Sequence, residues 1–207
     1  IDFLGEGWFD YTAAESEADW FNRGGFSKIQ PYYARNAEIY ALRDDVKPFI
    51  RSYFNTLAAM VSAENLSHWE HFHNAGAFNK THETGYFLQQ TRFLFAMEYG
   101  STLRLAPFVT DQWLKPTERI SIEALPTKFG RVSYTLVSHT DAGYLEAQVD
   151  TTGCEGFGGL ELRVRHPEGK PIVAVTVDGK AWTDFDVARN LIKLPAISEK
   201  QKVRISY

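Results

Sequence analysis

The stretch SHWEHFHNAGAFNKTHETG, residues 67–85, separates two kinds of sequence in this chain. Upstream residues favour helices, and residues after Leu103 favour strands. The stretch holds four of the six histidines, two glutamates and one tryptophan. Crowded among glycines and asparagines, such side chains are typical of a loop that lines a polar pocket. If the protein has a functional site, the sequence predicts it here.

Upstream of this stretch, apolar residues recur at steps of three and four, which is helical spacing. Ser27 can cap a first helix that tolerates Pro31 in an early position. Asp44 or Asp45 can begin a second helix, whose apolar face continues to Val61. Because the connection is so short, we expect an αα-hairpin of antiparallel neighbours.

Downstream of the stretch, a third helix is expected over residues 83–99, with Gly100 as its stop. The segment LRLAPF, residues 103–108, then alternates with period two. We therefore place a helical part at residues 1–102 and a strand-rich part at residues 103–207. No helix of about ten or more residues is expected within residues 118–207.

The strand-rich part contains short period-two runs at intervals of about ten residues. The Asp178-Gly179 pair is a strong hairpin signal, because it accepts the positive φ values of a type I′ turn. Such a series predicts an antiparallel β-sandwich and an α+β chain. The runs are RISIEALPT (119–127), RVSYTLVSHT (131–140), GYLEAQVD (143–150), GLELRVRHP (159–167), PIVAVTVDG (171–179) and NLIKLP (190–195).

The composition restricts the classes of partner. With 207 residues, 44% of them hydrophobic and 23% charged, the balance is that of a globular protein. The formal net charge of -4 and the absence of a Lys/Arg cluster disfavour nucleic acid. No apolar run approaches the roughly 20 residues that cross a bilayer, so no membrane partner is expected.

Cys154 is the single cysteine of the chain, which excludes an internal disulfide. We expect it to be a reduced thiol. A secreted, a periplasmic and a cytoplasmic location therefore all stay open. The passage GEGWF, residues 5–9, has the character of mid-domain sequence, so we expect the native chain to extend upstream of Ile1.

The histidines raise the alternative of a metal site, because zinc accepts imidazole ligands. However, the HExxH helix pattern is absent, and Cys154 is far away in the sequence. A histidine among aromatic residues more often lines a pocket through hydrogen bonds, so we expect no metal and no cofactor. The candidate ligands are His68, His71, His73 and His82.

Glu70 is the candidate acid–base residue. Trp69 and Phe72 give it a semi-apolar setting, which tunes the pKa of a carboxyl for acid or base chemistry. The alternative is a structural ion pair with an arginine or lysine. Glu83 is the weaker candidate, because a glutamate in the first turn of a helix is explained by the macrodipole.

The order of these segments resembles the C-terminal portion of the six-hairpin (α/α)6-barrel inverting glycosidases, especially the α-L-rhamnosidase-like group. The resembling features are a Trp-Glu dipeptide after an αα-hairpin, NKTHETG opening the last helix, LRLAP and a β-domain. They cover roughly residues 25–207, by order and short motifs only. The sequence departs from the family at His71 and Phe72, where an aromatic-flanked basic residue is usual.

The resemblance implies that Glu70 is a general base and that the helices are the incomplete end of a barrel. The family's general acid lies upstream of the segments present here, so this chain alone is expected to lack it, and inverting hydrolysis needs both carboxyls. The implied partners are an oligosaccharide or glycoside and the missing N-terminal part of the polypeptide, or a second copy. The alternative is a non-catalytic carbohydrate-binding or structural module. The implied substrate-binding residues are Trp69, His68, His82, Glu83, Tyr86 and Trp20.

Overall fold

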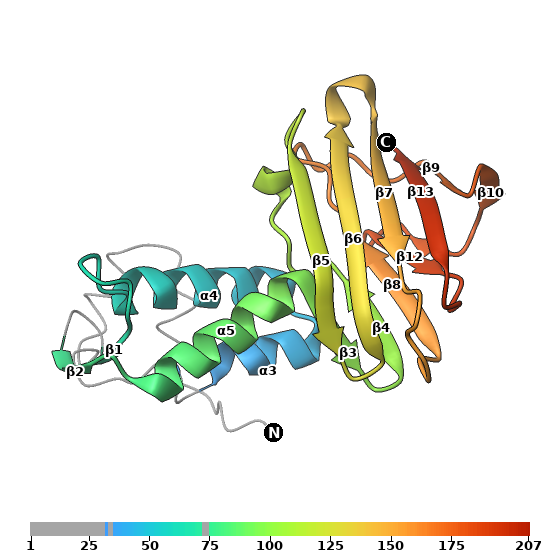
Figure 1. The fold of residues 1–207 in the computed structure, drawn as a ribbon. Helices are drawn as coiled ribbons and strands as arrows, with labels where there is room; N and C mark the ends of the chain where they lie inside the picture. Colours follow the sequence, from blue (N-terminus) through green and yellow to red (C-terminus); the bar gives the residue numbers. More distant parts are fainter. Residues whose placement is uncertain (1–31, 33–34, 72–74) are drawn as a thin grey trace. The chain divides into compact units, whose positions relative to one another are not determined.

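The computed structural model describes residue 32, residues 35–71 and residues 75–207 (Figure 1). The contacts between residues divide the chain into two compact units, Ile1–Phe93 and Leu94–Tyr207. The described elements are α-helical in the first unit, apart from one short hairpin, and mainly strands in the second. The chain is therefore α+β, and the sequence-predicted joint near residue 103 lies inside the second unit.

The described helices of the first unit are α3 (Asn36–Arg43), α4 (Val46–Met60) and α5 (Thr81–Phe95). Asp44 takes a left-handed conformation between α3 and α4, with a φ of 63°, and Asp45 is the N-cap of α4. This turn and the end of α4 beside Val61 confirm the predicted second helix. The predicted start of the first helix at Ser27 lies outside the described residues.

Aromatic packing joins α4 to α5. The rings of Tyr53 and Phe87 stack with their centroids 6.1 Å apart, and Phe49 is fully buried. Thr91 donates its hydroxyl proton to the carbonyl oxygen of Phe87. The Tyr53 hydroxyl must therefore donate to the Thr91 oxygen, 2.8 Å away.

The predicted helix over residues 83–99 extends too far at its C-terminal end. Helix α5 stops at Phe95, and β3 (Ala96–Tyr99) pairs antiparallel with β4 (Thr102–Leu105). Gly100 makes the reversal between them with a φ of 58°. Because AMEY, residues 96–99, continues the helical spacing of α5, its sequence alone does not predict a strand. The pairing of these residues with β4 makes them extended.

Two sheets form the second unit. The strand order β10-β9-β13-β7-β6-β5 makes the six-stranded sheet, and β11-β12-β8-β4-β3 makes the five-stranded sheet. The further strands are β5 (Arg119–Thr127), β6 (Gly130–His139), β7 (Tyr144–Asp150), β8 (Gly159–Arg163), β9 (Ala174–Val177), β10 (Lys180–Trp182), β11 (Phe185–Asp186), β12 (Leu191–Leu194) and β13 (Lys200–Ser206).

The six predicted period-two runs and the segment LRLAPF all contain strands. The predicted hairpin is confirmed by positive φ values at Asp178 and Gly179. In residues 118–207 the only helical element is the 3-10 turn η4 (Thr140–Ala142), as predicted; a second such turn, η3 (Asp111–Leu114), lies before them. The antiparallel expectation fails at one place, because β4 and β8 pair in parallel. Strand β13 was not predicted.

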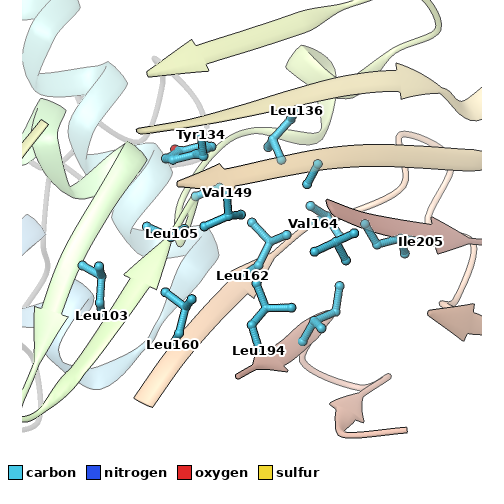
Figure 2. Packing of buried hydrophobic residues seen from close by; sticks show 14 of the residues in the cluster. Leu103, Leu105, Tyr134, Leu136, Val149, Leu160, Leu162, Val164, Leu194 and Ile205 are labelled. Carbon is cyan, nitrogen blue, oxygen red and sulfur yellow. The ribbon is translucent and has the colours of Figure 1, made fainter. Parts of the chain in front are cut away.

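The two sheets enclose one hydrophobic core (Figure 2). Side chains alternate along each strand, so that Val203 and Ile205 of β13 are buried whereas Lys202 and Arg204 are exposed. Leu162 contributes from β8 and is fully buried. This arrangement is a sandwich of two packed layers.

Cys154 is a free thiol, as predicted, and it is buried, with 1% of its surface exposed. It donates to the carbonyl oxygen of Arg131 at 3.3 Å. Burial raises the pKa of the Cys154 thiol, and the charge of Asp150 raises it further. Among the described helices, none combines the length and apolar character needed to cross a membrane.

Candidate functional site

The stretch at residues 67–85 forms a short hairpin followed by the first turns of α5, where a loop was predicted. Strands β1 (Trp69–His71) and β2 (Ala75–Phe78) pair antiparallel, with Trp69 opposite Phe78. The rings of these two residues lie 5.5 Å apart. Phe72 and His73 lie outside the described residues.

Glu70 lies in the middle of β1, and its side chain is 23% exposed. Its Oε1 lies 3.2 Å from the Lys80 ammonium, and its Oε2 accepts a long hydrogen bond of 3.4 Å from the backbone N–H of Ala77. The hydrogen bond from Lys80, supported by that from Ala77, holds the pKa of Glu70 below its ordinary value. Glu70 is therefore ionised at neutral pH.

The Lys80–Glu70 contact is the ion pair that the sequence left as an alternative to an acid–base role. An ionised carboxylate offers about four acceptor positions, so it can take part in more than one contact. An ionised, partly exposed carboxylate can take a proton from water.

His68 is a core residue of the helical unit and only 3% exposed. The ring of Phe87 lies 4.7 Å from it, and Tyr32 meets it edge-on at 5.6 Å. Burial lowers the pKa of His68, which favours the neutral imidazole. His68 therefore belongs to the aromatic core of the helical unit.

His82 and Glu83 form a pair at the start of α5, with Nε2 and Oε1 2.6 Å apart. His82 is 37% exposed, whereas the carboxylate of Glu83 is fully buried. Burial first, and then the nearby Tyr53 and Glu83, raise the pKa of Tyr32. Glu83 therefore acts inside the helical unit, and only His82 of this pair reaches the surface.

Tyr86 lies one turn further along α5 and is half-buried. The guanidinium of Arg35 lies 5.3 Å from the centre of its ring, a cation–π contact. One face of the Tyr86 ring is therefore occupied. Trp20, the remaining predicted substrate-binding residue, lies outside the described residues.

Glu38 of α3 is a buried carboxyl, 4% exposed, that the sequence analysis missed. Burial raises the pKa of Glu38, while hydrogen bonds from Arg35 and Gln90 oppose the shift. Its spacing from Ala41 on the buried side of α3 was the available signal, because residues three apart share one face. The pKa values of Glu38 and Glu70 are thus shifted in opposite directions.

The histidine-rich stretch gives no metal centre in the part of the chain that the structure describes. No group of three or more His, Cys, Asp or Glu side chains there is arranged to hold a metal ion. His68 and His82 are each engaged elsewhere, in the aromatic core and with Glu83.

Gly76→Ala is expected to destabilise the hairpin by ~1–3 kcal/mol, because Gly76 has a φ of +81°. An added Cβ would also lie 2.6 Å from Cδ2 of His71 and 3.1 Å from Cβ of Glu70. Chemical denaturation monitored by circular dichroism measures the loss.

Gly85→Ala is the matched control, since nothing lies within 4 Å of a Cβ there. Gly85 is inside α5, so alanine should stabilise the helix by ~0.5–1 kcal/mol. Equal effects of the two substitutions would contradict the hairpin geometry.

Lys80→Gln is expected to raise the pKa of Glu70 toward its ordinary value, because the Lys80 hydrogen bond is the largest cause of the shift. Because the pKa of Glu70 is lower in the folded protein than in the unfolded one, ionised Glu70 stabilises the fold at any pH above the unfolded pKa. This stabilisation is lost as the pH falls through the folded pKa. The variant should therefore be less stable at neutral pH, with the difference vanishing in acid. Carbon NMR titration of the carboxyl measures the pKa.

Lys170→Gln removes an ion pair of the same kind, 2.9 Å long, with Glu168. This control should change the titration of Glu168 and leave Glu70 alone. An unchanged pKa of Glu70 in Lys80→Gln would show that the ion pair does not set its protonation.

Comparison with known proteins assigns the chain to no family. No family model matches it, and no curated protein matches it. Among the solved structures that match, one named "Glycoside hydrolase" aligns with a TM-score of 0.40 at 12% sequence identity. The alignment covers 83% of this chain and 29% of that chain, so this chain spans less than a third of that structure's length.

Proposed function

We propose that this chain is part of a glycoside hydrolase in which Glu70 is the general base of an inverting mechanism. The supporting observation is the ionised, 23% exposed carboxylate of Glu70, adjacent in β1 to Trp69. A base must be ionised to accept a proton, and an indole offers an apolar face to a sugar ring.

In the proposed reaction, Glu70 takes a proton from a water molecule while the oxygen of that water forms a bond to the anomeric carbon. The glycosidic C–O bond breaks on the opposite side, and the leaving oxygen takes a proton from a carboxylic acid. The two carboxyls of such a pair are about 6.5–9.5 Å apart. We assign the acid to a segment upstream of the part that resembles the family.

The substrate contacts in this proposal come from residues that reach the surface. His82 is 37% exposed and can hydrogen-bond to a sugar hydroxyl, while Trp69 and Tyr86 offer ring surface. His68 and Glu83 are buried, so we assign them a supporting role inside the helical unit.

The proposal includes further helices that cover the helical unit, from an upstream part of the same polypeptide or from a second copy. Large apolar side chains are exposed there, which supports such a cover. They are Leu42, Leu66, Phe78 and Leu88, with exposures of 57%, 78%, 54% and 60%.

The competing function is a non-catalytic carbohydrate-binding or structural module. The 3.2 Å ion pair between Lys80 and Glu70 favours it, because a paired carboxylate can serve stability alone. The burial of His68 also fits a histidine-rich segment that only supports packing.

Incubation of the complete natural polypeptide with a panel of α- and β-linked aryl glycosides separates the two functions. The hydrolase proposal predicts release of the aryl alcohol from at least one glycoside. Binding of oligosaccharides without any release, measured by calorimetry on the same sample, would favour the module and contradict the hydrolase.

A further inference from the structure

The outer face of the six-stranded sheet carries a continuous row of polar side chains. Ser121 of β5 lies opposite Thr135 of β6, Thr135 opposite Gln148 of β7, and Gln148 opposite Lys202 of β13. All four are exposed or half-exposed, and their neighbours along each strand point into the core. The row therefore presents hydroxyls, an amide and an ammonium across four adjacent strands.

Two shallow hollows lie along this row. One, of about 330 Å³, reaches from β7 and β13 to Thr176 and Gly179. The other, of about 250 Å³, reaches from β13 to Arg119 and Glu123 on β5. Both are lined by Gln148 and Lys202. From β9 to β5 there are four interstrand spacings, or about 19 Å, which suits an extended chain.

The five-stranded sheet offers no comparable face within the described residues. On the side that points away from its core, Glu161 is partly buried and Lys193 is exposed, but four other side chains are almost completely buried. They are Met97, Arg104, Arg163 and Leu191, with exposures of 2%, 7%, 3% and 1%. The open polar row is thus a property of the six-stranded sheet.

Charge pairing along β13 leaves Lys202 without a carboxylate partner in the described part of the chain. Arg204 lies 3.3 Å from the carboxylate of Glu146, and Lys200 lies 3.5 Å from that of Asp150. Lys202 belongs to none of the ion pairs found among the described residues, although it lies between these two pairs along β13. Its ammonium is therefore available to an anionic group placed in either hollow.

The surroundings of Lys202 restrict which class of anionic ligand could bind there. Besides Lys202, only Arg119 among the cations that line the hollows is outside the ion pairs of the described residues, so the face lacks the several unpaired cations that a phosphate backbone requires. The row has no apolar side chain to receive a lipid or the apolar face of a helix. Hydroxyl and amide groups both donate and accept, as the hydroxyls of sugars do.

We propose that this face binds an acidic oligosaccharide, a chain of sugars that carry carboxylates. The ammonium of Lys202 contacts one carboxylate, and Gln148, Thr135 and Ser121 exchange hydrogen bonds with hydroxyls of adjacent sugars. The site lies in the strand-rich unit, needs no covalent step and does not depend on Glu70.

Calorimetric titration with oligogalacturonate and oligoglucuronate tests the proposal, with their methyl esters as ligands of the same shape without charge. The acid forms should bind about tenfold more tightly than the esters, because a charge-assisted hydrogen bond is lost on esterification. Added salt should reduce the difference in affinity between the acid forms and the esters. Backbone NMR shifts should centre on Thr135, Gln148 and Lys202.

Lys202→Gln should remove the preference for the acid form, while Lys115→Gln, an exposed lysine of the same unit outside both hollows, should keep it. The backbone NMR shifts of Trp69, His82 and Tyr86 should stay unchanged, which separates this site from the proposed hydrolysis. Several results would overturn the proposal: no binding of either acid, equal binding of acid and ester, a preference that persists in Lys202→Gln, or equally tight binding of poly-glutamate.

Discussion

Turnover of the complete natural polypeptide is expected to fall about a hundredfold or more in Glu70→Gln, with KM nearly unchanged. Glutamine keeps the shape of the side chain but cannot accept the proton of the attacking water. Substrate binding should persist, since Trp69 and His82 are untouched. Steady-state kinetics, normalised to the folded fraction, measure both constants.

Glu64→Gln is the matched control, because Glu64 is an exposed glutamate in the turn after α4. Its kinetics should equal those of the wild type. The acid limb of kcat/KM should lie below the ordinary range of a carboxyl, because the pKa of Glu70 is lowered, and should move up in Lys80→Gln. Full turnover in Glu70→Gln would leave the ion pair as the sole role of this residue.

The stability of the β-sandwich is expected to fall by ~2–5 kcal/mol in Leu162→Ala. Leu162 is fully buried in β8, with Leu105 of β4 on one side and Ile192 of β12 on the other. Both neighbours are held by strand pairing, so they cannot move to fill the cavity left by the lost side chain. Denaturant unfolding at neutral pH measures the change.

Val173→Ala is the corresponding control, since Val173 is 63% exposed just before β9. Its effect should stay within about 0.5 kcal/mol. A loss below about 1 kcal/mol in Leu162→Ala would contradict a close-packed core between the two sheets.

Alternation of apolar and polar residues was enough to locate most strands of the second unit. It failed at residues 96–99, because AMEY fits both a helical and an extended period, and only the contact with β4 selects the strand. Strand β13 alternates as well, from Lys200 to Ser206, but no turn signal as strong as Asp178-Gly179 marks its start.

The order of strands in the sheets could not be read from the sequence. Strand β4 pairs in parallel with β8, more than fifty residues later in the chain, across the whole β5–β7 meander. Periodicity describes each strand by itself and carries no information on its neighbour. The expectation of purely antiparallel pairing therefore failed at this pair alone.

The candidate site was predicted in its location more than in its geometry. The crowding of polar side chains located Glu70, and an ion pair was foreseen without its partner, Lys80. That contact depends on the β1–β2 hairpin, which brings Lys80 back toward Glu70. The burial of His68 and Glu38 depends on helix packing, which sequence spacing constrains only weakly.

The configuration of the first sugar released tests the central claim most directly. Proton NMR of the complete natural polypeptide, recorded within the first minutes of aryl glycoside hydrolysis, distinguishes the two anomers before mutarotation. An inverting enzyme with Glu70 as its base should release the anomer opposite to that of the substrate, and Glu70→Gln should release almost none. Release of the retained anomer, or equal release by Glu70→Gln, would contradict the account.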